Sequence, residues 1–364
     1  MSEAIAAGAP PLAVLSRPRA PLALPLLAGG LLLSLLASAM TGPVALPPAQ
    51  VAGILAAQFG IETGITYTPM QAGVLMEVRL PRLVLAVLVG FGMALAGAAM
   101  QGLFRNPLAD PGIVGVSSGA ALGAVGWIVL AGQIPLLGAL GGWLGAYALP
   151  AFAFLGGLLT TLVIYRLAGI GRPEAQTFML LLAGVAISAL TGAATGLLTY
   201  IANDEQLRSI TFWTMGSLGN AGWEQIPVLL LLMLPTTLGL FALYRLLDAL
   251  LLGEAVAGHL GFDMRRARPL LVVLTALMVG TAVSMTGIIG FIGLMAPHIA
   301  RLIVGPGHRR LLPAAALIGA LLLVVGDMVA RTLASPAEIP IGILTALVGG
   351  PFFLFLLLSR RVGP

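Results

Sequence analysis

The sequence contains no cysteine and no lysine, and only 9% of its 364 residues are charged. Without cysteine the chain cannot form disulfides, thiolate metal sites or a cysteine nucleophile. Without lysine it cannot supply the phosphate-binding lysine of a Walker A loop. If ATP drives this protein, another chain must bind the nucleotide.

So few charged residues cannot give a soluble globule a polar surface. Hydrophobic residues make up 59% of the chain and the mean hydropathy is +1.07, which indicates a protein embedded in lipid. The net charge of +5 comes from arginines that occur singly or in pairs and never as a basic stripe. We therefore expect membrane lipid, and no nucleic acid, as a partner.

Apolar runs of helix length divide the chain into membrane spans. Leu83–Phe104, for example, has about 22 uncharged residues, which at about 1.5 Å each are long enough to cross a hydrocarbon core of about 30 Å. Ten spans are predicted, and they are Leu22–Met40, Leu83–Phe104, Gly112–Ala131, Tyr147–Tyr165, Thr177–Tyr200, Gln225–Tyr244, Pro269–Thr286, Gly287–Val304, Leu311–Gly326 and Pro340–Ser359.

The distribution of arginine predicts the orientation of these spans. When the chain starts inside, fourteen of the eighteen arginines fall on the cytoplasmic face, as positively charged loops should. Both termini are then cytoplasmic, and residues 1–21 form an N-terminal tail. The exceptions on the outer face are Arg79, Arg82, Arg208 and Arg331, which need a reason of their own.

Glycine and proline recur at an offset of 190 residues, as in Gly90 with Gly280 and Pro107 with Pro297. The offset spans five helices, an odd number, so the two halves would lie in the membrane with opposite topology. We therefore predict two inverted five-helix repeats, at about residues 22–202 and 225–361. Most glycines are expected to allow close helix packing, with Gly290 and Gly293 among the contact positions.

Four sequence blocks together resemble the permease subunits of type II ABC importers, the FecCD family, which takes up haem, ferric siderophores and vitamin B12. The resemblance covers about residues 22–361. The blocks are Arg79 to Gly119 with Arg105-Asn106-Pro107-Leu108-Ala109-Asp110-Pro111; Leu252-Gly253-Glu254-Ala255 with His259-Leu260-Gly261; Gly290 to Leu294 with Ala296-Pro297-His298-Ile299-Ala300-Arg301; and Gly326-Asp327-Met328-Val329-Ala330-Arg331 through Glu338-Ile339-Pro340-Ile341-Gly342 to Phe352.

The resemblance implies an all-α, ten-span subunit with the type II ABC importer fold, working as a homodimer in the bacterial inner membrane. It also implies two cytoplasmic ATPase subunits, which hold the ATP and Mg, and a periplasmic substrate-binding protein. In such permeases outward-facing arginines dock glutamates of the binding protein, and the matching positions here are Arg79, Arg82 and Arg331. Contact with lipid headgroups alone is the simpler interpretation.

The segment 248–268 carries apolar residues between likely glycine breaks, so we expect short helices on the membrane surface. By resemblance this is the coupling element that contacts the ATPase, although it could also be an interfacial segment that touches only lipid. The residues assigned to coupling are Gly253, Glu254, Ala255, His259, Leu260, Gly261 and Arg265. The cytoplasmic loop with Arg105, Asn106, Pro107 and Asp110 is expected to be a tight turn, with Asp110 capping the next span.

By resemblance, span five, the following segment and span ten line the translocation path, with Leu180, Leu197, Trp213 and Met215 as candidates. The cargo is an iron complex, with haem ranked first, then a ferric siderophore, then a corrinoid. Binding of each cargo to the cognate binding protein would identify it.

The polar residues in the spans favour no catalysis. We expect Asp327 to pair with Arg331 four residues later and Glu338 to open the last span. No metal site, resident cofactor or catalytic residue is predicted, since the three histidines fall on the cytoplasmic side. Two rivals are weighed. An intramembrane serine protease would use the Gly115 to Gly119 pattern, and an ion-coupled secondary transporter would need ionisable residues at mid-membrane.

Overall fold

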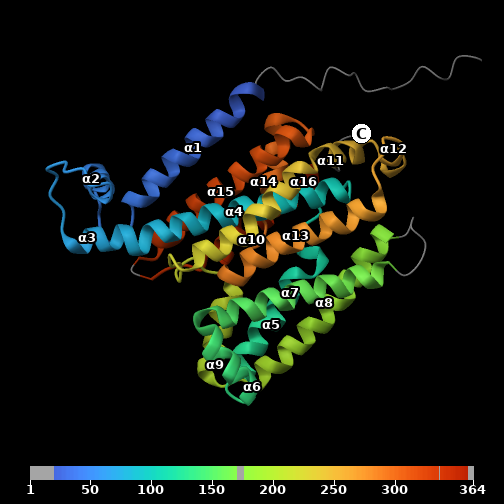
Figure 1. The fold of residues 1–364 in the computed structure, drawn as a ribbon, viewed down its shortest axis with the longest axis horizontal. Coiled ribbons are helices and arrows are strands. Elements are labelled where there is room, and N and C mark those ends of the chain that lie inside the picture. The colour runs from blue at the N-terminus through green and yellow to red at the C-terminus, as the bar shows by residue number, and fades with distance from the viewer. Residues whose placement is uncertain (1–19, 170–175, 336, 360–364) are drawn as a thin grey trace, which may run out of the picture.

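The computed structural model describes residues 20–169, 176–335 and 337–359, and within these ranges the protein is helical, with no strand (Figure 1). The predicted tail, residues 1–21, lies outside the described residues except for its last two. So do five of the arginines that were assigned to the cytoplasmic face, which are Arg17, Arg19, Arg172, Arg360 and Arg361.

Each of the ten predicted spans corresponds to one helix. In chain order these helices are α1 (Ala20–Met40), α4 (Leu80–Leu103), α5 (Val116–Leu130), α7 (Ala148–Ala168), α8 (Gln176–Tyr200), α10 (Gln225–Ala242), α13 (Met264–Thr286), α14 (Ile292–Val304), α15 (His308–Leu333) and α16 (Ile341–Ser359). Helices satisfy their own backbone groups, which is what a lipid environment demands.

Among the described residues, seven helical segments are long and apolar enough to cross a membrane, whereas α5, α14 and α16 are shorter apolar helices. The number of ten crossings therefore stays a prediction. The start predicted for span eight was wrong: the chain is not helical from Gly287 to Phe291, because both of these residues have left-handed backbone angles, φ 72° and φ 67°. Helix α14 consequently begins only at Ile292.

Shorter elements lie between the spans and were mostly not predicted. They are α2 (Pro48–Gln58), α3 (Pro69–Gly73), the π-helix η2 (Val74–Arg79), the 3-10 helices η3 (Pro111–Val114) and η4 (Gly145–Tyr147), α6 (Pro135–Leu144), α9 (Asp204–Met215), α11 (Tyr244–Leu251) and α12 (Glu254–His259). Since α3 and η2 run directly into α4, this helix continues well beyond the predicted span.

Helix α4 occupies the centre and packs against α15, α14 and α13. Glycine pairs allow the close approach. A Cβ atom placed on Gly90 would lie 2.4 Å from the carbonyl oxygen of Gly319, and one on Gly97 would lie 1.8 Å from that of Gly293. Small residues thus do the packing that hydrophobicity cannot do in lipid. The expectation for Gly290 was wrong, because no atom lies within 4 Å of its Cβ position.

The helix pairing is reciprocal between the two halves of the chain. Helix α4, the second predicted span, packs on α15, the ninth, and α13, the seventh, packs on α7, the fourth. Likewise α5 packs on α7 as α14 packs on α15. The inverted repeat itself stays a prediction, and the two halves interlock without forming separate bodies.

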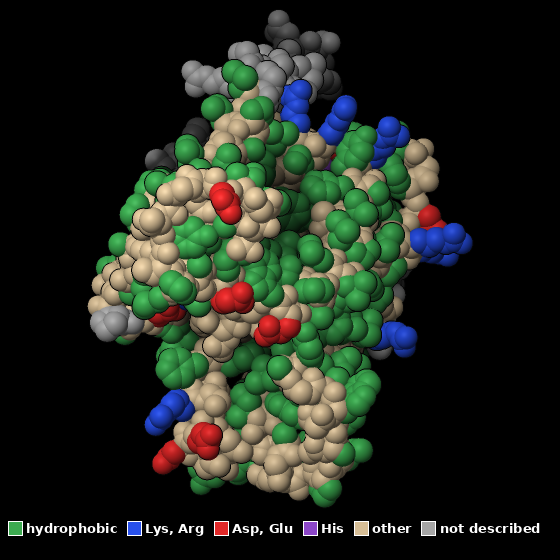
Figure 2. All heavy atoms as spheres, turned by 60° about the vertical axis from the view of Figure 1, so that its left-hand side comes forward, with side chains coloured by type: hydrophobic (Ala, Val, Ile, Leu, Met, Phe, Trp, Pro, Cys, Tyr) green, Lys and Arg blue, Asp and Glu red, His purple; other side chains and the backbone are tan. Residues whose placement is uncertain are grey.

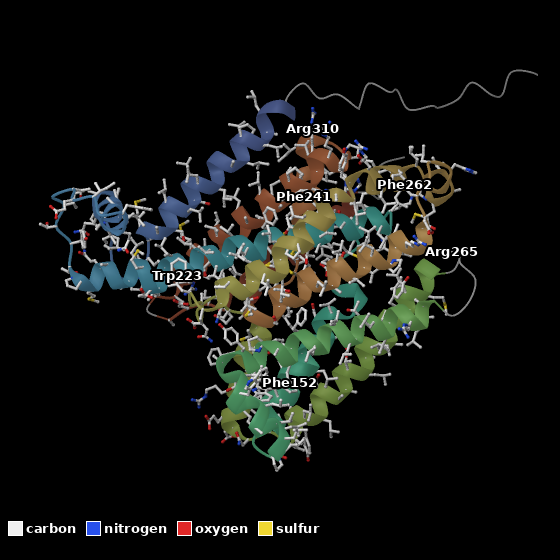
Figure 3. All side chains as sticks on the ribbon, in the orientation of Figure 1. Phe152, Trp223, Phe241, Phe262, Arg265 and Arg310 are labelled. Carbon is white, nitrogen blue, oxygen red and sulfur yellow. The ribbon has the colours of Figure 1, made fainter. Side chains whose placement is uncertain are left out.

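The bundle has two ends, which we call outer and inner. The start of α4 and the ends of α1 and α15 meet at the outer end, beyond which α2 and α3 project (Figure 1). The inner end holds α11 and α12, and Figure 3 shows Phe262 and Arg265 beside α12 and Trp223 far from them. In Figure 2 most visible arginines lie along the upper and right edges, with acidic side chains on the face in front.

Candidate functional site

The outer end holds three buried arginines and two acids, of which Asp327 is buried and Glu338 is half-exposed. Arg82 donates from Nε to both oxygens of Asp327, at 2.9 and 3.1 Å, and from Nη1 to both oxygens of Glu338, at 3.0 and 2.8 Å. Arg331 donates from Nε to Asp327 Oδ2 at 3.0 Å. One carboxylate, 1% exposed, thus binds two guanidinium groups from different helices.

Arg79 and the remaining guanidinium nitrogens of Arg331 donate hydrogen bonds to oxygens at the C-terminal end of α1. Arg79 donates to the carbonyl oxygens of Ala39, at 2.7 Å, and Val44, while Arg331 donates to Ser38 Oγ at 2.7 Å and to the Ser38 and Thr41 carbonyls at 3.2 Å. The last carbonyls of a helix have no partner within it and carry partial negative charge, so cations stabilise them. These arginines therefore tie α1 to α4 and α15.

The predicted pair of Asp327 with Arg331 is confirmed. The ion pairs of Arg82 with Asp327 and Glu338 were not predicted. The presence of three arginines and two acids at the outer ends of the spans could have indicated them. Arg79, Arg82 and Arg331 are 3, 7 and 6% exposed, so this single chain leaves little of their side chains for a binding protein. Their docking role stays a prediction. Arg208, on α9, is the exposed outer arginine among the described residues.

The predicted coupling segment contains the expected short helices. Gly253 and Gly261, with φ 113° and φ 92°, bound α12 on both sides, in backbone conformations that favour glycine. Glu254 pairs with Arg268 at the start of α13, which holds α12 against that helix. Glu254 forms this ion pair, whereas the other predicted coupling residues Ala255, His259 and Arg265 are exposed.

The solvent-exposed side of the predicted coupling segment carries several apolar side chains. Leu252 and Leu260 are 67 and 60% exposed, and Leu251 and Val256 are also exposed. An apolar surface beside charged groups is what a partner's groove or a membrane interface would cover. The contact itself stays a prediction.

Helix α11 is fixed to α15 by a long-range cap. Asp248 accepts hydrogen bonds from the backbone N of His308 at 2.6 Å and from its ring Nδ1 at 3.0 Å. The carboxylate thereby occupies the positive N-terminus of α15. A movement of α11 must therefore either move α15 or break this cap.

The predicted turn after α4 is present. Asn106 accepts a hydrogen bond from the Leu108 backbone N at 3.0 Å, and Asp110 caps η3 by accepting from Gly112 N at 2.7 Å. Burial raises the pKa of the Asp110 carboxyl above its usual value. Arg105 has φ 50° and lies 3.8 Å from the Cβ position of Gly253, so this turn abuts the coupling segment.

The four path candidates do not form one site in this chain. Leu180 is buried and Leu197 is 65% exposed, about 26 Å further along α8 at about 1.5 Å per residue. The carbonyls of Trp213 and Met215, in contrast, lie against Gly287 and Gly342, 2.0 and 2.2 Å from the Cβ positions of those glycines. The end of α9 thus meets the start of α16, the two elements that were predicted to act together.

No group of three or more His, Cys, Asp or Glu side chains among the described residues could hold a metal ion. The serine pattern lies at the start of helix α5, where Ser118 Oγ contacts the Gly115 carbonyl and Ser188 Oγ at 3.1 and 3.2 Å. This helical setting differs from the strand-to-helix elbow of serine hydrolases.

Comparison with known proteins gives consistent matches over most of the chain. The sequence model of the FecCD transport family matches residues 30–359. The hemin transport system permease protein HmuU of Yersinia pestis is 46% identical over 286 residues, 79% of this chain and 83% of that protein. The cobalamin import system permease protein BtuC of Halobacterium salinarum is 40% identical over 324 residues, 89% of this chain and 82% of that protein.

Among solved structures, a metal-chelate type ABC transporter in an inward-facing conformation superimposes with a TM-score of 0.79 and 35% sequence identity. The superposition covers 93% of this chain and 99% of that one.

Proposed function

Because this chain belongs to the FecCD transport family and is a multi-pass permease of a type II ABC importer, we propose that it moves haem from a periplasmic binding protein into the cytoplasm. The observation that carries the choice of haem is the 46% identity with a hemin permease. Family membership also removes the basis for the two rivals, a serine protease and an ion-coupled transporter.

A ferric siderophore or a corrinoid is the alternative cargo. The identity with cobalamin and vitamin B12 permeases is 40 to 44%, only slightly lower than the 46% with the hemin permease. All three cargoes are bulky, and a path of apolar and small side chains would pass them on without holding them tightly. Such a wall suits the proposed lining by α8, the end of α9 and α16.

The working assembly we propose is a homodimer in the inner membrane with two ATPase subunits that bind ATP and Mg. The inner end would face the cytoplasm, because α11, α12 and most of the described arginines lie there. The exposed apolar side chains of α12 and its flanks would enter a groove of each ATPase. Since α1 starts and α16 ends at the inner end, both termini would be cytoplasmic.

At the outer end the binding protein would dock over the arginine network. Because Arg79, Arg82 and Arg331 are engaged within the chain, we propose that they hold the docking surface in shape, and that a direct pair with the binding protein requires one of their internal bonds to open. The half-exposed Glu338 marks where the network reaches the surface.

The test is reconstitution in vesicles with the cognate ATPase and binding protein. Uptake of hemin, a ferric siderophore and cobalamin is measured with ATP present, and each cargo is titrated against the binding protein alone. We expect ATP-dependent uptake of hemin and its tightest binding. Preferred uptake of cobalamin would replace haem as the cargo, whereas uptake driven by an ion gradient without the ATPase would overturn the importer itself.

A further inference from the structure

Residues 48–78, which comprise α2, the loop after it, α3 and most of η2, stand beyond the outer end of the bundle (Figure 1). We call them the outer arm. Since α3 and η2 continue directly into α4, Pro69 lies about 20 Å before Leu83, the start of the predicted span, at about 1.5 Å per residue. The outer arm therefore lies outside the predicted hydrocarbon core. None of the roles assigned above uses it.

The outer arm exposes large apolar side chains although it lies outside the predicted spans. Phe59, at the end of α2, is 82% exposed, and Ile61 and Met70 are 58 and 68% exposed. On a span such as α10, lipid covers side chains like Leu231, which is 73% exposed. Water would surround the side chains of the arm instead. A group of exposed apolar side chains outside the membrane indicates a surface that a partner covers.

A cavity of about 590 Å³ lies beside these side chains, between α2 and the loop that follows it. Its lining includes Ile61 and Ile65 together with Glu62 and Tyr67, and so combines apolar groups with a carboxylate and a hydroxyl. The volume lies within the range of small-ligand sites, so the cavity has room for side chains of a partner.

Hydrogen bonds hold the outer arm in one shape. Gln71 on α3 donates from Nε2 to Gln50 Oε1 on α2 at 2.8 Å. Thr68 and Gln71 cap the start of α3 reciprocally, at 2.9 and 3.2 Å. Near the base of the arm, Trp223 donates from Nε1 to the Met76 carbonyl at 2.7 Å. A surface that is ordered before binding loses less conformational entropy when a partner docks.

The exposed charge of the outer arm is negative. Glu62 and Glu77 are exposed, and neither carboxylate makes an ion pair or a hydrogen bond within the described residues. The neighbouring Arg79 is buried and donates to the Ala39 and Val44 carbonyls. A partner that covers the arm therefore meets carboxylates without compensating guanidinium groups. Figure 2 likewise shows acidic side chains on the face in front.

We propose that the outer arm is a docking surface for the binding protein, whose facing surface carries an apolar patch flanked by arginine or lysine side chains. The apolar patch would cover Phe59, Ile61 and Met70, and the basic groups would pair with Glu62 and Glu77. This chemistry is opposite to that expected of the outer arginines, which would meet glutamates. The inference rests on the proposed assembly with a binding protein and on no choice of cargo.

The position of the outer arm and its charge favour the binding protein over a second copy of this chain. The arm is continuous with the arginine network over which the binding protein would dock, because Arg79 directly follows it. A twofold pairing of two arms would place Glu62 and Glu77 of one copy near the same acids of the other. Figure 1 also shows α2 and α3 far from α8 and α9, which belong to the proposed path.

The test measures binding of the cognate binding protein to the full-length chain with its ATPase in nanodiscs, by biolayer interferometry at low salt and at about 0.5 M salt. Glu62→Gln combined with Glu77→Gln removes both charges, and Phe59→Ser removes the most exposed apolar side chain of the arm. Glu205→Gln is the matched control, since Glu205 is exposed at the same end but lies on α9, one turn before Arg208.

We expect the double glutamine variant to bind about tenfold more weakly at low salt and less than about threefold more weakly at high salt, because ions screen the charges at the rim of an interface. Phe59→Ser should weaken binding about tenfold at both salt concentrations, since it removes apolar area that docking would bury. Glu205→Gln should stay within about twofold of the wild-type chain.

Phe59→Trp gives a second measurement that removes no apolar contact. Relative to the wild-type chain, its fluorescence should shift to the blue when the binding protein is added. Quenching by brominated lipid before that addition would assign the patch to the membrane and overturn the proposal. Unchanged affinity in the double variant and in Phe59→Ser, or an equal loss in Glu205→Gln, would also overturn it and leave the importer function standing. No binding to the wild-type chain would overturn the proposed assembly as well.

Discussion

The outer network predicts that removing the charge of Asp327 will lower the free energy of unfolding much more than removing the charge of Glu338. Asp327 is 1% exposed and binds both Arg82 and Arg331, whereas the side chain of Glu338 is 45% exposed and binds Arg82 alone. Asp327→Asn removes the charge that compensates two buried cations, and water cannot take its place. Glu338→Gln removes a charge that water can replace.

The expected magnitudes follow from burial. Breaking a buried ion pair by removing one partner costs about 3–5 kcal/mol, and Asp327→Asn should fall near the lower limit, because Arg82 keeps Glu338 and Arg331 keeps the oxygens of Ser38 and Thr41. An exposed pair contributes about 0.2–1 kcal/mol, so Glu338→Gln should cost no more than that. The two variants should therefore differ by about 2 kcal/mol or more.

The assay is unfolding by SDS in mixed micelles, followed by tryptophan fluorescence. Glu62→Gln, an exposed acid on the same end, is the control and should leave the free energy of unfolding unchanged. Equal costs for Asp327→Asn and Glu338→Gln, or a larger cost for Glu338→Gln, would refute the reasoning that burial decides the strength of this network.

Three further predictions use the same preparation. Gly97→Ala should prevent recovery of folded protein, because its Cβ would lie 1.8 Å from the Gly293 carbonyl oxygen, while Gly29→Ala, with open space around it, should fold normally; size-exclusion chromatography compares the two. Asp248→Asn should cost about 1–2 kcal/mol in the SDS assay by weakening the cap of α15, and more than Asp263→Asn, which caps α13 in an exposed position. Glu254→Gln should change stability by less than about 1 kcal/mol, since its side chain is 41% exposed, yet lower the stimulation of ATP hydrolysis by loaded binding protein severalfold; unchanged stimulation would contradict a coupling role for α12.

The sequence was sufficient to predict the helices but not all their ends. Uncharged runs located one helix for each predicted span, because lipid requires apolar side chains over about 30 Å. The end predicted for span nine, Gly326, was too early, because α15 continues past Asp327 and Arg331 to Leu333. A charged residue marks the end of a span only where it has no partner of opposite charge. Asp327 and Arg331 pair with each other within α15.

The candidate site was harder to predict because its contacts join distant parts of the chain. Asp327 with Arg331 is a four-residue pair that helix geometry makes visible, and it was predicted. Arg82 with Asp327, 245 residues apart, and Asp248 with His308, 60 apart, depend on which helices become neighbours. The outward position of Arg79, Arg82 and Arg331 was readable from the charge distribution, whereas their burial was not.

The same two helices, α4 and α15, are fastened at both ends, and this limits where the path can open. At the outer end Asp327 joins them through Arg82, in the middle Gly90 and Gly319 bring their backbones into contact, and at the inner end Gly102 lies against His308. A pair held at three levels moves as one body.

Helix α16 contacts the rest of the chain more sparsely, and its start meets the end of α9. We therefore expect nucleotide-driven motion at α12 to tilt α4 and α15 together, and the gate to open where α9 and α16 separate from them. Spin labels at the exposed positions 212 on α9 and 347 on α16 should change their separation with nucleotide, whereas labels at the exposed positions 78, in η2 directly before α4, and 333, at the end of α15, should not; this is the result that the argument requires.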